Sequence, residues 1–137
     1  MLTAKRVLSG LALAVLLSGV AGQALSEDLK PNKKRGQVYF KMVCTVCHMQ
    51  MTEQAIPPAS RTMDEWRAYF DANRHDVSGQ TRPELDYYMS REYRESIKDS
   101  NKAARKFLDL PDEQVNADVR EFAISGAKDS DTPASCN

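Results

Sequence analysis

Cys44-Thr45-Val46-Cys47-His48 is the stretch of this 137-residue chain on which the interpretation of the rest depends. Cys-x-x-Cys-His is the attachment signature of c-type haem. On a helix, a step of three residues separates two thiols by about one turn, so both can reach the same porphyrin edge. The next residue, His48, can then place an imidazole nitrogen on the iron. The motif predicts one covalent haem c, held through Cys44 and Cys47, with His48 as a metal ligand.

Two other kinds of site use the Cys-x-x-Cys spacing. A structural zinc site needs four ligands, and besides the motif the chain offers only His75 and Cys136, neither of which lies in a second ligand pair. A dithiol redox motif belongs in a βαβ pattern, and no strand-like alternation surrounds this one. Haem is therefore the interpretation that the motif favours.

The N-terminus has the pattern of a secretory signal peptide over residues 1–24. Lys5 and Arg6 form the positive start, residues 7–17 are mostly apolar, and residues 18–24 are rich in small side chains. The apolar run is short for a membrane span, so we expect membrane association only if the leader is retained. The predicted location is the periplasm or another compartment reached by export.

Formal charges balance along the whole chain, with 19 Lys and Arg side chains and 19 Asp and Glu side chains. Loss of Lys5 and Arg6 with the leader would leave 17 basic and 19 acidic side chains, a net charge of −2. Nucleic-acid binding needs a basic surface, so no nucleic acid is expected as a partner. A mildly acidic surface suits weak contacts with basic patches on redox partner proteins.

The remaining chain divides into a lead-in (25–32), a haem domain (33–127) and a flexible tail (128–137). The tail is rich in Asp, Ser and Thr, which is typical of disordered ends. Cys136 lies in this tail and is the odd cysteine. In an oxidising compartment it is either a disulfide partner for another chain or an incidental residue.

Apolar periodicity predicts helices and no strand, and so a small all-α domain. In the first helix Val38, Met42 and Val46 recur every four residues and are expected to form the apolar stripe, widened by Phe40 and Val43. The domain is short of apolar side chains, so we expect a haem to fill its centre. The helices are expected at 33–46, at 62–74, within 84–106 with a break near 99–101, and at 111–125.

Two short patterns define the helix boundaries. Paired prolines cannot continue a helix, so the stretch 49–61 is expected to be a loop. Thr62-Met63-Asp64-Glu65 fits a capping box at the start of the second helix. Pro111, followed by acidic residues, starts the last helix, and Gly126 ends it.

A glycine and two aromatic residues stand at positions that bear on the family to which the chain is similar. Gly36 and Phe40 lie eight and four residues before Cys44, and Phe122 lies in the last predicted helix. With the haem motif, they make the chain resemble the small soluble monohaem cytochrome c family over about residues 33 to 126. The resemblance implies a helical domain wrapped around one haem, in which the glycine and the aromatic residues let the first and last helices cross closely. It also implies attachment of the haem outside the bacterial cytoplasm.

The resemblance further bears on the iron ligands. Pro57 or Pro58 resembles the proline whose carbonyl accepts a hydrogen bond from the motif histidine, a bond that raises the basicity of the ring. The family normally supplies a methionine as second axial ligand in a loop before the last helix, and this chain has none just before Phe107. The candidates for the second ligand are His75, which we favour, Met89 and Met63.

Arg61, Arg82 and Trp66 are candidate partners of the haem propionates, because a buried carboxylate needs charge-assisted hydrogen bonds. The alternatives are solvated arginines and a tryptophan that packs in the core.

An electron carrier is the function that these features favour, because it needs no catalytic residues and the chain offers no other constellation. One alternative is a haem enzyme or gas-binding protein with an open iron site, in which His75 would be a distal group. Another alternative is a haem subunit of a larger oxidoreductase.

Overall fold

The computed structural model describes residues 29–75 and 82–135. The predicted signal peptide, the first part of the predicted lead-in and Cys136 lie outside the described residues. Within the described ranges, no helix has both the length and the apolar character needed to cross a membrane.

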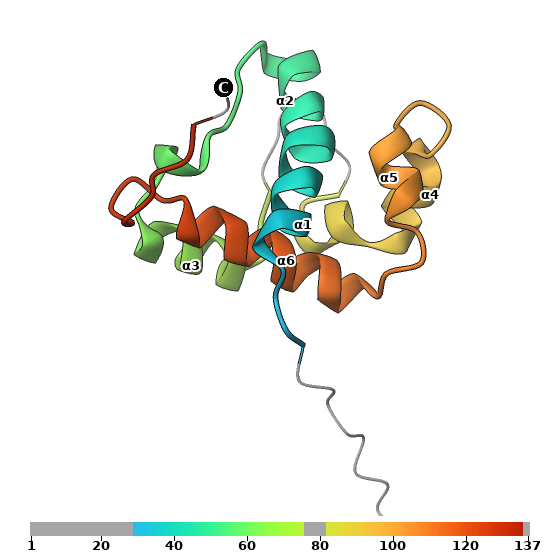
Figure 1. Cartoon of the computed structure of the whole chain (residues 1–137). Helices are drawn as coiled ribbons and strands as arrows, with labels where there is room; N and C mark the ends of the chain where they lie inside the picture. Colours follow the sequence, from blue (N-terminus) through green and yellow to red (C-terminus); the bar gives the residue numbers. More distant parts are fainter. Residues whose placement is uncertain (1–28, 76–81, 136–137) are drawn as a thin grey trace, which may run out of the picture.

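The described part of the chain is helical and contains no strand, which confirms the all-α prediction. One isolated β-bridge joins Arg74 to Glu84. Figure 1 shows α1 and α2 as one column, with α3 on one side of it and α4 and α5 on the other. The elements are α1 (Lys33–Tyr39), the π-helical turn η1 (Phe40–Cys44), α2 (Thr45–Thr52), η2 (Pro58–Ser60), α3 (Met63–Ala72), η3 (Asp86–Met89), α4 (Arg91–Ile97), α5 (Lys102–Lys106) and α6 (Asp112–Ser125).

The first helix runs further than predicted, because α1, η1 and α2 follow one another without a break. Asn32 caps α1 and accepts a hydrogen bond from the backbone N–H of Arg35 at 3.0 Å. The predicted end at residue 46 is too early, since the chain stays helical until Glu53 adopts a left-handed conformation with φ 58°. The paired prolines that suggested a loop lie beyond this turn. Helical π-turns are rare and occur frequently at functional sites.

The apolar stripe predicted for this helix is wrong. Val38, Met42 and Val46 are 47%, 51% and 36% exposed. Phe40 and Val43, which were expected only to widen the stripe, belong to the buried face. Both sets recur at helical spacing, so periodicity alone does not decide between them. The face that meets α6 is the one that becomes buried.

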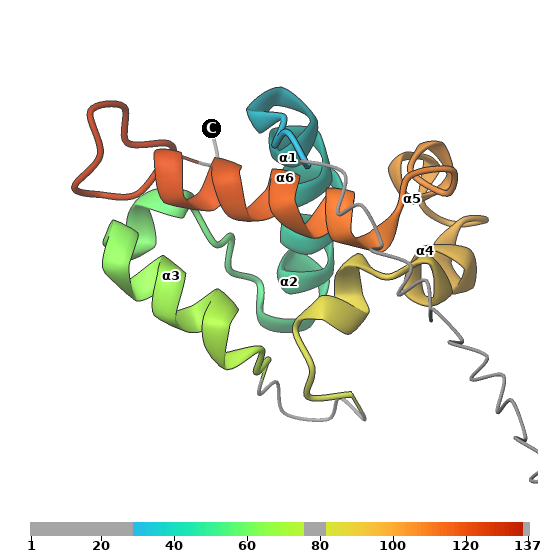
Figure 2. The same ribbon diagram turned by 90° about the horizontal axis from the view of Figure 1, so that it is seen from below.

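That face is selected by the crossing of α1 over α6 (Figure 2). A Cβ atom on Gly36 would lie 1.9 Å from the carbonyl oxygen of Asp118, so only glycine allows this approach. The fully buried carboxylate of Asp118 accepts a hydrogen bond from the backbone N–H of Asn32 at 2.7 Å and pairs with Arg35. The close approach of the first and last helices that was expected at Gly36 is therefore present. Phe122 is buried, with its ring centre 5.5 Å from that of Phe40.

The second predicted helix, α3, begins with the predicted capping box. The Thr62 hydroxyl accepts a hydrogen bond from the backbone N–H of Glu65 at 3.1 Å, and the Glu65 carboxylate accepts one from the backbone N–H of Thr62 at 2.7 Å. Trp66 and Phe70 are buried on its inner face. The helix ends slightly earlier than predicted, because Asn73 takes a left-handed conformation with φ 47°.

The charged stretch after residue 84 forms η3, α4 and α5, and the predicted break lies between the last two. Arg94 is fully buried there. Its guanidinium donates hydrogen bonds to the carbonyls of Phe107 and Leu110 and pairs with Asp112. This one side chain therefore ties α4 to the start of α6.

The described part of the predicted tail packs on the domain. The backbone N–H of Lys128 donates to the carbonyl of Arg61 at 2.9 Å, and that of Ala134 donates to Gly126 at 2.9 Å. Ala59 in turn donates to the carbonyl of Ala134 at 3.1 Å. After α6 ends at Gly126, as predicted, residues 128–135 thus cover the loop before α3.

Candidate functional site

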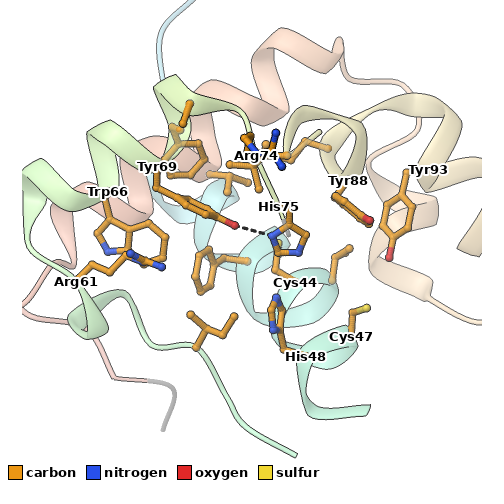
Figure 3. A pocket seen from close by; sticks show the side chains of 18 of the residues that line it. Cys44, Cys47, His48, Arg61, Trp66, Tyr69, Arg74, His75, Tyr88 and Tyr93 are labelled. Carbon is orange, nitrogen blue, oxygen red and sulfur yellow. Dashed lines mark hydrogen bonds between the residues drawn. The ribbon is translucent and has the colours of Figure 1, made fainter. Parts of the chain in front are cut away.

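A cavity of about 500 Å³ is lined by residues of η1, α2, α3 and η3. Its volume lies within the roughly 300–1,000 Å³ typical of small-molecule and cofactor sites. Cys44, Cys47 and His48 all line it, and so does His75 from the segment after α3 (Figure 3). The structure therefore brings together all four residues that were predicted to hold a haem. Most of the other lining side chains are apolar or aromatic, among them Phe40, Val43, Ile56, Trp66, Phe70 and Leu85.

The two histidines point toward one another across this cavity (Figure 3). Their ring centres are 5.4 Å apart, and the planes of the rings make an angle of 69°. Two imidazoles on one metal, at about 2 Å per metal–nitrogen bond, place their ring centres roughly 6 Å apart. The pair of His48 and His75 is therefore spaced close to what one iron atom between them requires.

His48 is positioned by α2, and its ring makes no hydrogen bond to any residue in the described ranges. Burial lowers the pKa of His48, so the neutral imidazole that a metal needs persists to lower pH. The expected hydrogen bond to a proline carbonyl is absent among the described residues. The carbonyl of Pro58 accepts the indole N–H of Trp66 at 2.7 Å, and that of Pro57 accepts the backbone N–H of Ser60 at 2.9 Å.

His75 is fixed from two sides. Its backbone N–H donates to the carbonyl of Pro83, beside the bridge between Arg74 and Glu84. Its ring nitrogen Nδ1 lies 2.5 Å from the hydroxyl oxygen of Tyr69, a hydrogen bond drawn in Figure 3. Because Nδ1 is engaged in this bond, a metal would be bound through Nε2.

The two thiols differ in their surroundings. Burial, together with the neighbouring Cys47, raises the pKa of Cys44 to about 12. The Cys44 thiol is therefore protonated at neutral pH, whereas a bare metal ion needs the thiolate. The sulfur of Cys47 lies 3.7 Å from that of Met51.

The donor set suits a cofactor that brings its own metal ligands. Within the described ranges, no group of three or more His, Cys, Asp or Glu side chains is arranged to hold a metal ion. The imidazoles of His48 and His75 could hold one metal between them, and a porphyrin would supply that metal's remaining ligands. The residues present therefore fit a haem.

The other candidate ligands lie less favourably. Met89 is 2% exposed and lines the cavity, but the ring that faces His48 is that of His75. Met63 packs against the core and is not among the lining residues.

Of the three candidate propionate partners, Arg61 and Trp66 line the cavity and Arg82 does not. Arg61 lines the cavity, with its guanidinium carbon 5.0 Å from the ring centre of Tyr69 and 5.5 Å from that of Trp66. Arg82 is not a lining residue and pairs with a glutamate of α4. Arg74 also lines the cavity, although nothing in the sequence marked it.

Three tyrosines line the cavity that sequence reasoning did not assign to it, namely Tyr69, Tyr88 and Tyr93. The ring centre of Tyr88 lies 4.9 Å from that of His75 and 5.2 Å from that of Tyr93. Burial raises the pKa of Tyr93, and the neighbouring Cys47 raises it further. Tyr69 stands three residues after Trp66, a spacing that could have indicated a shared helix face. The other two depend on the turn between η3 and α4.

No family model, curated protein or solved structure matches the chain.

Proposed function

We propose that this chain is an exported monohaem c-type cytochrome that carries electrons between partner proteins. In this proposal Cys44 and Cys47 hold one haem through thioether bonds, and His48 and His75 are its two axial ligands. The observation that carries the proposal is the pair of imidazoles with ring centres 5.4 Å apart, in a largely apolar cavity that both motif thiols line.

A bound haem supplies a metal that gains and loses one electron. The chain's own part is to hold both axial positions with side chains that are already in place. His48 is set by α2, and His75 by its bonds to Tyr69 and Pro83. With both positions held by these side chains, a bound haem would leave no open position for a substrate, and a carrier needs none.

The cavity walls support this role. Apolar and aromatic side chains form most of the lining, and Arg61 and Arg74 bring positive charge to it. We propose that these two arginines, rather than Arg82, pair with the haem propionates. Two histidine ligands also predict a lower reduction potential than one histidine with one methionine.

The absorption spectrum of the oxidised holoprotein tests the ligand set. We expect a low-spin spectrum without the weak far-red band that marks methionine ligation. The variant His75→Ala should lose the low-spin spectrum, whereas the matched variant Met89→Leu, which keeps the side-chain volume, should retain it. Loss of the low-spin spectrum in Met89→Leu alone would contradict the proposal.

Carbon monoxide separates the carrier from an open-site haem protein. We expect the reduced wild-type protein to bind carbon monoxide slowly or not at all, and His75→Ala to bind it rapidly. Rapid binding by the wild type would instead favour an enzyme or a gas-binding protein.

Export and partners need separate tests. N-terminal sequencing of the protein from a periplasmic extract should show that the leader has been removed. Co-purification of a fixed set of other subunits would favour a haem subunit of a larger oxidoreductase.

A further inference from the structure

The hydroxyl of Tyr69 lies 2.5 Å from Nδ1 of His75, on the far side of the ring from the nitrogen that would bind iron. We propose that Tyr69 is a positioning residue that fixes the tautomer of His75 and strengthens it as an electron donor to the metal. This inference rests on the proposed haem ligation and adds a determinant of the reduction potential.

Tyr69 is held independently of His75. It lies on α3, where its ring centre is 5.8 Å from that of Trp66 and 6.1 Å from that of Phe70. The guanidinium of Arg61 covers its ring at 5.0 Å. Trp66 is itself anchored by its hydrogen bond to the carbonyl of Pro58. The phenol oxygen of Tyr69 is therefore held in place by contacts that do not involve His75.

His75 is brought to this oxygen by a separate set of backbone contacts. The left-handed residue Asn73 turns the chain after α3. Its carbonyl accepts the backbone N–H of Leu85 at 3.2 Å, and its side chain accepts that of Asp86 at 2.8 Å. The hydrogen bond between Tyr69 and His75 thus joins two groups whose positions are set elsewhere, so little conformational entropy is lost in making it.

The direction of the hydrogen bond follows from the proton count. A neutral imidazole carries one N–H, and the nitrogen that binds a metal must be unprotonated. If the metal takes Nε2, Nδ1 carries the proton and donates it to the phenol oxygen of Tyr69. An acceptor in this position raises the basicity of a histidine ligand. A more basic ligand stabilises the oxidised metal, so the hydrogen bond should lower the reduction potential.

We expect this effect on the reduction potential to come from only one of the two proposed histidine ligands. His48, the ligand from the motif, has no hydrogen bond to its ring within the described ranges, whereas His75 has Tyr69. The residue that tunes the site would therefore lie on α3 and not in the segment that carries the motif.

The test compares Tyr69→Phe with Tyr87→Phe in the holoprotein. Both variants lose one hydroxyl, but Tyr87 is not among the residues that line the cavity. We expect Tyr69→Phe to raise the midpoint potential and to let added imidazole displace His75 about tenfold more readily, the low end of the effect of such partners. Tyr87→Phe should leave both quantities unchanged. Equal values for Tyr69→Phe and wild type, or equal shifts in both variants, would overturn the inference.

The variant His75→Ala separates this inference from the function on which it rests. If His75→Ala leaves the low-spin spectrum intact, the proposed ligand set is wrong, and the role of Tyr69 is overturned with it. If His75→Ala abolishes that spectrum while Tyr69→Phe changes neither potential nor displacement, only the role of Tyr69 is overturned.

Discussion

At Gly36 the backbone of α1 comes so close to the backbone of α6 that no side chain fits between them. The variant Gly36→Ala should therefore be less stable by about 1–3 kcal/mol, the usual cost of overpacking, or by more if the helices separate. Helix propensity alone would favour alanine over glycine by about 1 kcal/mol, so the sign of the change is informative. Guanidinium unfolding followed by the fluorescence of Trp66, the single tryptophan, measures it. The exposed neighbouring change Gln37→Ala is the control, and stability at or above wild type in Gly36→Ala would contradict the close crossing.

Two valines on the same continuous helix test which apolar stripe is buried. Val43 is 2% exposed, and Val38 is 47% exposed. The change Val43→Ala removes buried methyl groups and should cost about 2 kcal/mol. The matched change Val38→Ala should stay within about 0.5 kcal/mol of wild type. The same denaturation experiment measures both, and equal losses would mean that the predicted stripe of Val38, Met42 and Val46 is buried after all.

Among the elements, α3 has the start that is most fully determined by adjacent residues. Its capping box links Thr62 and Glu65 in both directions. Removal of the cap by Thr62→Ala should cost about 1 kcal/mol. We expect the loss in α3, the helix that carries Tyr69. Chemical denaturation of the variant measures the loss of stability.

The same cap makes stability depend on pH. The hydrogen bond from the backbone N–H of Thr62 lowers the pKa of Glu65 below its ordinary value of 4.5. The stabilisation is therefore present above that ordinary value and is lost as the pH falls through the lowered one. Glu65→Gln keeps an acceptor but cannot titrate, so it should lose less stability than wild type when urea midpoints at pH 7 and about pH 3 are compared. Identical losses in the two proteins would rule out this role of Glu65.

The elements that sequence reasoning predicted well are those whose signals lie within a few adjacent residues. The capping box of α3 and the stop of α6 at Gly126 are of this kind. The buried face of α1 was missed because it depends on contact with α6, far away in the sequence. His75 was named as a ligand because it is the one other histidine and stands at the end of the second predicted helix, where a short turn could bring it over the haem. Its position opposite His48 depends on the left-handed turn at Asn73, which no spacing rule predicted.

At the scale of the whole molecule, the cavity adjoins the hydrophobic core, and several side chains belong to both, namely Phe40, Val43, Trp66, Phe70, Met89 and Val119. From the scarcity of apolar residues we predict that the protein without haem is poorly folded, because a group bound only by the native state stabilises that state. Circular dichroism of the double variant Cys44/Cys47→Ala tests this. Low helicity and a broad thermal transition are expected, and a fully helical form that unfolds cooperatively would refute the prediction.

The π-turn at Phe40–Cys44 joins α1 to α2 in one continuous helix. Before the turn, α1 packs against α6 at Gly36. After the turn, Cys47 and His48 of α2 line the cavity. Each residue of a helix advances the chain by about 100° around the axis. Inserting a further residue between Gly36 and the motif would therefore rotate Cys47 and His48 by about that angle relative to the contact with α6. Deleting a residue inside the turn should be milder, because a π-turn holds one residue more than an α-turn and can close into one. The length of chain from Gly36 to Cys44 is thus constrained by rotation.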